Sequence, residues 1–258
     1  MFEAEAALDA CLPIFGRLPG AAVIDEGDLR MIASGRGDGA LNHVAATRLE
    51  PERVAGRVAE VRRELQASGS LPATWWITST TSPADLAIRL EAAGLRPEEP
   101  EFGMVYRLAG GLPEVALPDG AVLQVLAPND GLGEWIDVMR AAYGWKNPAK
   151  VEAEIELYRV RPGETPPWTH VLVTLNGRPA ASGSLFTFGG HAFVTNIGTI
   201  PEARGLGLGS VATAATLSIA RRQGFGRASL TASVMGRSMY ARLGFREECR
   251  LDRLTLGA

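Results

Sequence analysis

The chain has 258 residues, of which 46% are hydrophobic and 21% are charged, and its formal net charge is −3. These values are typical of a globular protein with a sizeable core, and a slightly acidic chain without a basic stripe is not expected to bind nucleic acid. No apolar run approaches the length of a membrane span, so no membrane association is expected either.

The first half of the chain alternates between extended and helical segments. An extended run over 41–49 meets Pro51-Glu52, and a helix follows to about residue 67. Next come a predicted strand over 73–78, a helix over 83–93 and a strand that ends at residue 108. Trp75 and Trp76 fall inside the first of these strands, where aromatic residues favour a core position.

A segment rich in glycine and proline, without periodicity, separates the two halves. Such composition is typical of a linker. We place the linker at 111–120, between a first domain at 1–110 and a second at 121–258.

The second half predicts a longer series of elements. A strand over 122–126, helices over 133–143 and 149–160, a hairpin and a strand over 191–200 come first. The hairpin joins 171–175 to 180–188 at Asn176-Gly177, a dipeptide that strongly favours a tight turn. A helix over 211–222, a strand over 227–232, a short helix and a closing strand complete the series.

The two halves resemble each other in the order of their elements. Pro51-Glu52 precedes Pro201-Glu202 by 150 residues, and Gly94 precedes Gly244 by the same distance. Matched elements around matched residues favour a duplicated domain over an unrelated first half.

The most informative segment runs from Pro201 to Ser210, between a β-branched strand and a helix. Gly205, Gly207 and Gly209 alternate in it, so no Cβ holds a ligand away from the backbone. The N–H groups at the start of a helix favour an anion such as a pyrophosphate.

Two families of phosphate-binding glycine motif fit poorly. A P-loop ends in Gly-Lys-Ser/Thr, whereas this run ends in Gly209-Ser210. A dinucleotide site requires an acidic residue at the next strand, and the strand over 227–232 has none.

A third family fits better. Arg204-x-x-Gly207-x-Gly209 resembles the pyrophosphate signature Q/R-x-x-G-x-G/A of the GNAT family of N-acetyltransferases. The segment from Ser233 to Phe245 resembles that family's later motif, with Tyr240 four residues before Gly244-Phe245. The resemblance covers about 121–255.

The resemblance implies an α/β (α+β) fold of two tandem acetyltransferase-like domains. Each would be a mixed, mostly antiparallel sheet flanked by helices, with splayed central strands in the second domain. It also implies that acetyl-CoA is the cofactor, and the residues expected to bind it are Ile197, Gly198, Thr199, Arg204, Gly205, Leu206, Gly207, Leu208, Gly209, Ser210 and Ser233. Ser233 departs from the asparagine often found at its position in the family.

Amide formation then suggests further roles. Backbone N–H groups near Ile197-Gly198-Thr199 would face the oxyanion, and Tyr240 is the candidate that protonates the leaving thiolate. The strand over 191–200 has no carboxylate to act as base. His170 and His191 each begin a strand, where a surface histidine is expected.

The first half lacks the corresponding chemistry. Arg53 to Val58 replace the alternating glycines, and Leu90 stands 150 residues before Tyr240. We therefore expect a degenerate copy that does not bind CoA.

Few residues of the sequence point to the acceptor substrate. Tyr143, Trp145 and Trp168 suggest either an aromatic acceptor moiety or packing between the two domains. The expected function is acetyl-CoA-dependent transfer to a primary amine of a small molecule or peptide. A non-catalytic acyl-CoA sensor or interaction module is the alternative. A homodimer is compatible with both.

Cysteine usage and the N-terminus indicate the compartment. Two cysteines, Cys11 and Cys249, are too few for a disulfide framework. The first residues are acidic where a signal peptide would be basic. A cytoplasmic location is expected.

Overall fold

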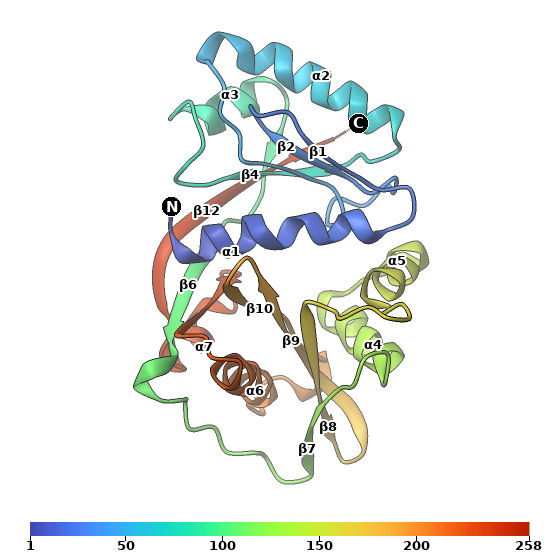
Figure 1. Ribbon diagram of the computed structural model, residues 1–258, viewed down its shortest axis with the longest axis vertical. Coiled ribbons are helices and arrows are strands. Elements are labelled where there is room, and N and C mark those ends of the chain that lie inside the picture. The colour runs from blue at the N-terminus through green and yellow to red at the C-terminus, as the bar shows by residue number, and fades with distance from the viewer. Residues whose placement is uncertain (258) are drawn as a thin grey trace. The chain divides into compact units, whose positions relative to one another are not determined.

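The computed structural model describes residues 1–257, which divide into two compact units (Figure 1). The first unit comprises Met1–Gly103, Ala232–Met235 and the chain from Glu248 onward. The second comprises Met104–Thr231 and Gly236–Glu247. None of the helices within residues 1–257 combines the length and hydropathy of a transmembrane span.

The first unit is a mixed sheet with helices on both faces. Its strands run in the order β1-β2-β3-β4-β12, and β5 pairs with β12. Only β3 and β4 are parallel among the pairs resolved in this unit. The elements are α1 (Glu3–Cys11), α2 (Val54–Ala67), α3 (Leu86–Ala92), β1 (Ala22–Asp25), β2 (Arg30–Ala33), β3 (His43–Ala45), β4 (Ala73–Ile77), β5 (Arg96–Pro97) and β12 (Arg246–Leu256).

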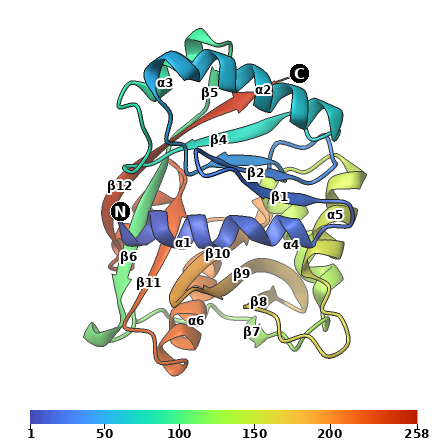
Figure 2. The ribbon, with the colours of Figure 1, turned by 45° about the horizontal axis from the view of Figure 1, so that its top comes forward.

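Two tryptophans show how the first unit is layered. Trp75 is fully buried in the core beneath α2 and α3, and its Nε1 donates to Thr47 Oγ1 at 2.9 Å. Trp76 follows it on β4 and therefore points to the opposite face, on the side of α1 (Figure 2). Both are buried, which confirms the core position predicted for them.

The second unit contains the longer sheet. Its strands run β6-β11-β10-β9-β8-β7, antiparallel from β7 to β10 and parallel between β10 and β11. Helices α4 and α5 lie on one side of strands β8–β10 and α6 on the other (Figure 1). The elements are β6 (Glu101–Arg107), β7 (Ala121–Val125), α4 (Leu132–Tyr143), α5 (Pro148–Tyr158), β8 (Trp168–Leu175), β9 (Arg178–Phe188), β10 (His191–Thr199), α6 (Leu208–Arg222), β11 (Arg227–Ala232) and α7 (Arg237–Arg242).

The predicted fold class is confirmed: mixed, mostly antiparallel sheets are flanked by helices. The predicted hairpin is also present, and Asn176 and Gly177 have φ angles of 50° and 77°, as a tight two-residue turn requires.

The closing strands are exchanged between the halves of the sequence. β12 ends the second half, yet it pairs with β4 of the first unit, from Asp252↔Ile77 to Leu256↔Ala73. Residues 104–107 of β6 come from the first half, yet they belong to the second unit, where β6 neighbours β11. The bounds of the compact units thus differ from the linker that the sequence suggests at 111–120. The division into domains at that linker stays a prediction.

Backbone details repeat between the two units. Short 3₁₀ turns at Pro51–Arg53 and Pro201–Ala203 are 150 residues apart. Ala46 and Asn196, also 150 residues apart, have φ angles of 54° and 56°. A left-handed conformation is uncommon for residues other than glycine, so this match supports duplication.

The units differ after the 3₁₀ turn. In the first unit α2 begins at once with Val54, whereas in the second a loop over 204–207 precedes α6. The first unit therefore has no counterpart of the glycine loop. From Val54 the positions that correspond to that loop belong to helix α2.

Candidate functional site

The glycine loop lies between β10 and α6, as the sequence predicts. Gly205 and Gly207 both have φ = 81°, and Gly207 is the N-cap residue of α6. A Cβ added to either glycine would meet nothing within 4 Å. Backbone conformation therefore accounts for these two glycines, and the loop's outer face is open.

The N-terminus of α6 presents backbone donors beside this loop. The helix has 15 residues, and its first intrahelical bond in this region runs from Val211 N to Gly207 O at 3.1 Å. The N–H groups of Leu208, Gly209 and Ser210 precede that bond, at the positive end of the helix dipole. No acidic side chain lies in the first turn. The arrangement favours an anion.

Gly209 has a different role from the other two glycines. A Cβ there would lie 3.3 Å from Thr199 Oγ1 and 3.4 Å from Met239 Sδ. The absence of a side chain lets α6 pack closely against β10 and α7.

Arg204 is exposed, and its guanidinium binds the surrounding backbone. Nη2 donates to Ala142 O at 3.0 Å, and Nε lies 3.4 Å from Thr199 O. These bonds tie the loop to the end of α4 and to β10. Nη1 takes part in neither of these two bonds, and the contact of Arg204 with a phosphate stays a prediction.

β10 is interrupted beside the loop. Its register with β9 shifts between Thr195 and Gly198, and Asn196 within the shift has positive φ. In residues 1–257 the parallel pairing of β10 with β11 is confined to Phe193↔Ser229. The two central strands therefore separate before Ile197, Gly198 and Thr199, the predicted contacts of a thioester.

Gly198 itself packs against a helix. A Cβ there would lie 2.9 Å from Ala142 Cβ and 3.1 Å from Ser182 Oγ. The close approach at this glycine is thus made by α4 and β9. Contact between its backbone and a ligand stays a prediction.

A polar network that the sequence did not reveal stabilises the interruption. Asn196 Nδ2 donates to Tyr158 OH at 3.1 Å and lies 3.4 Å from Ser184 Oγ, while Ser182 Oγ donates to Asn196 O at 3.0 Å. Ser184 Oγ also bonds to His170 Nδ1 at 2.8 Å. The network therefore connects the irregular backbone of β10 with α5, β8 and β9.

His170 is buried, so the expectation of a surface histidine is wrong. It lies opposite Ser184 in the β8–β9 register, and its ring centroid is 4.2 Å from that of Trp135. Its Nε2 has no hydrogen-bond partner among residues 1–257. Burial lowers the pKa of His170 to about 3, and the imidazole is therefore neutral near pH 7.

The aromatic residues proposed to contact an acceptor separate into two groups. Trp168 is buried and packs against Tyr158 and Phe186 at centroid distances of 5.8 and 6.0 Å. Tyr143 is 51% exposed, stacks on Trp145 at 6.0 Å and donates from its hydroxyl to Ile197 O at 3.1 Å. Of the three aromatic residues proposed to contact an acceptor, Tyr143 is the one whose hydrogen bond reaches the interrupted strand.

Tyr240 lies on α7 with 8% of its surface exposed. Its ring packs edge-on against Phe245, with centroids 5.7 Å apart. Ser233 is exposed and belongs to the first unit, and its contact with a cofactor stays a prediction.

The comparisons with known proteins agree with this geometry. Residues 134–245 match the model of the Acetyltransferase (GNAT) family. No curated protein matches the chain.

Solved structures share the fold over almost the whole chain. A GCN5-related N-acetyltransferase from Kribbella flavida is similar with a TM-score of 0.75 at 20% identity, covering 99% of this chain and 96% of that one. A second, from Sphaerobacter thermophilus, gives 0.66 at 14% identity over 91% and 82% of the two chains. A tandem GNAT protein from the clavulanic acid biosynthesis pathway gives 0.61 at 18% identity over 93% and 84%.

Proposed function

We propose that this chain, whose residues 134–245 belong to the GNAT family, is an acetyl-CoA-dependent N-acetyltransferase. Its acceptor is a primary amine of a small molecule or peptide, which attacks the thioester directly. The observation that carries the proposal is the open glycine loop at the N-terminus of α6, next to the interruption of β10.

The residues present fit this cofactor. The loop leaves backbone N–H groups uncovered by any Cβ at Gly205 and Gly207, and Arg204 adds guanidinium donors. These groups would hold the pyrophosphate, since helix N-termini and charged donors both favour it. Acetyl-CoA supplies an activated acetyl group when it is bound.

The second unit would assist the transfer in two ways. N–H groups around Ile197, Gly198 and Thr199 would stabilise negative charge that develops on the carbonyl oxygen. The hydroxyl of Tyr240 would give its proton to the departing sulfur. His170 is a poor base for an ammonium group because burial lowers its pKa to about 3.

Titration calorimetry of the full chain with acetyl-CoA, and separately with NAD, tests the cofactor. We expect micromolar affinity for acetyl-CoA at one site per chain, lost in Gly207→Glu because a strained, acidic side chain would replace the open backbone. Gly20→Glu is the matched control, since Gly20 has φ = 80°, no atom within 4 Å of an added Cβ, and a place in the first unit.

The outcomes are distinct. Retained binding in Gly207→Glu, or no binding by a protein shown to be folded, would contradict the proposal. A second site in the wild type would contradict the expectation that the first unit does not bind CoA. The full chain is needed, because a fragment of the first half would lack β12.

Replacing Tyr240 by phenylalanine should lower turnover by about 10²-fold or more without changing the affinity for acetyl-CoA, because the proton donor is removed while the ring that packs against Phe245 is kept. Tyr106→Phe is a suitable control. Tyr106 also packs against Phe245, at 5.3 Å, and its hydroxyl donates to Gly111 O. A loss of less than about threefold in Tyr240→Phe would exclude a general-acid role.

A non-catalytic acyl-CoA sensor is the second candidate. It is favoured by the lack of any carboxylate on β10 and by the neutral, enclosed state of His170. A panel of amines assayed with acetyl-CoA separates the two functions. Release of CoA that depends on one amine class supports the enzyme, and binding without turnover supports the sensor.

A further inference from the structure

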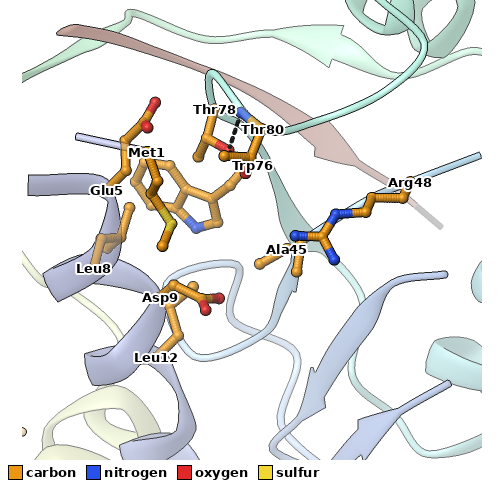
Figure 3. Close-up of a pocket in the computed structure, with 11 residues that line it drawn as sticks. Met1, Glu5, Leu8, Asp9, Leu12, Ala45, Arg48, Trp76, Thr78 and Thr80 are labelled. Carbon is orange, nitrogen blue, oxygen red and sulfur yellow. Dashed lines mark hydrogen bonds between the residues drawn. The ribbon is translucent and has the colours of Figure 1, made fainter. Parts of the chain in front are cut away.

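The first unit contains a pocket of its own (Figure 3). Its walls come from α1, from the end of β3 and from the end of β4. We propose that this pocket binds a small monocarboxylate with an apolar body.

The pocket lies where the duplicated fold opens. β3 and β4 pair in parallel at His43↔Thr74 and Val44↔Trp75, and the pocket begins with the next residues, Ala45, Ala46 and Trp76. In the second unit the corresponding parallel strands, β10 and β11, also separate beside a left-handed residue. The first unit has thus kept the opening between its central strands, although it has no glycine loop for the phosphates.

The two carboxylates in the wall are already bound to other groups. Glu5 is buried and accepts from Ser79 N at 2.6 Å and from Ser79 Oγ at 2.5 Å. Asp9 forms an ion pair with Arg30 at 2.9 Å. Neither acid therefore requires a cationic ligand.

Arg48 is the cationic side chain in the wall that remains available. It is exposed, and within residues 1–257 no carboxylate lies within ion-pair distance of it. Figure 3 shows its guanidinium directed across Ala45 toward the side of the pocket that holds Trp76. A planar guanidinium binds a carboxylate through two parallel hydrogen bonds.

The remaining walls define the rest of the ligand. Trp76, Leu8 and Leu12 are buried apolar residues that line the pocket, and they would cover an aliphatic or aromatic body. The hydroxyls of Thr78 and Thr80, 3.1 Å apart, offer further polar contacts. One guanidinium and an apolar floor match a single negative charge better than a phosphate ester.

The test uses hexanoate and phenylacetate, titrated into the full chain by calorimetry and by saturation-transfer NMR. Hexanamide and hexylamine are the uncharged and cationic comparisons. We expect the two carboxylates to bind and the amide and amine to bind at least about tenfold more weakly, because the charged hydrogen bonds to Arg48 are lost.

Variants locate the site. Arg48→Met should weaken carboxylate binding by about tenfold or more, and Arg48→Lys should weaken it less, since it keeps the charge without the planar fork. Arg53→Met, at an exposed arginine outside the pocket, should leave it unchanged. Equal affinity of acid and amide, full affinity in Arg48→Met, or no binding at millimolar concentration would each overturn the proposal.

This inference does not depend on the acetyltransferase proposal. Arg48→Met should bind acetyl-CoA like the wild type, and Gly207→Glu should bind hexanoate like the wild type. Failure of one site therefore leaves the other proposal intact.

Discussion

Replacing Asn196 by valine is expected to destabilise the protein by about 3 kcal/mol and to weaken acetyl-CoA binding by at least about tenfold. A β-branched residue held at φ near 56° costs about 1–3 kcal/mol. The lost side-chain bonds to Tyr158 OH and Ser184 Oγ add about 0.5–1.5 kcal/mol each. The strand would relieve this strain by closing the interruption at which the thioester is proposed to bind.

Two further variants separate the backbone from the side chain. Asn196→Gly adopts positive φ freely and loses only the side-chain hydrogen bonds. It should therefore lower the free energy of unfolding by less than Asn196→Val does. Tyr158→Phe removes one partner and leaves the backbone residue unchanged. Urea unfolding and acetyl-CoA calorimetry measure the two effects, and Asn196→Ala, with a strain of about 1–2 kcal/mol, replaces the valine variant if that does not fold.

The contrast between units explains why the side chain matters. Ala46 holds the same left-handed conformation in the first unit without any side-chain hydrogen bond of this kind. The surrounding strands can therefore impose the conformation alone, at some cost in strain. If Asn196→Val binds acetyl-CoA with unchanged affinity, the interruption of β10 does not contribute to the cofactor site.

The features that the sequence predicted correctly are those that depend on neighbouring residues. A turn at Asn176-Gly177 and a strand-to-helix junction at Gly205 and Gly207 follow from the φ angles that these residues favour. The prediction of a duplicated domain also depended on local signals. Pro51 and Pro201, 150 residues apart, each begin a short 3₁₀ turn. Such signals can be read without knowing which strands pair.

The features that the sequence missed depend on pairing between distant strands. Nothing in the local sequence of β12 indicates that its partner is β4 rather than a strand of its own half. The position of His170 is set by its register opposite Ser184 on β9, so its burial could not be read from its place near a strand start. Residues 1–40, where no element was predicted, form α1, β1 and β2, and α1 supplies a wall of the pocket in the first unit.

The second large effect expected is a loss of stability in mild acid caused by His170. Burial lowers the pKa of His170 to about 3, against about 6.5 for a histidine in the unfolded chain. As the pH falls below 6.5, the unfolded state takes up a proton that the folded state does not. The free energy of unfolding should therefore fall by up to about 1.4 kcal/mol per pH unit, or about 2–3 kcal/mol between pH 6.5 and 4.5.

His170→Asn should remove this pH dependence. Its amide can replace Nδ1 as the partner of Ser184 Oγ, and it does not titrate. The variant is expected to be less stable than the wild type at pH 7, because it fills less of the space beside Trp135, and to lose less stability on acidification. Urea unfolding from pH 7 to 4.5 measures both. Equal slopes in the two proteins would mean that His170 titrates in the folded state, and the imidazole would then return as a candidate base for the acceptor amine.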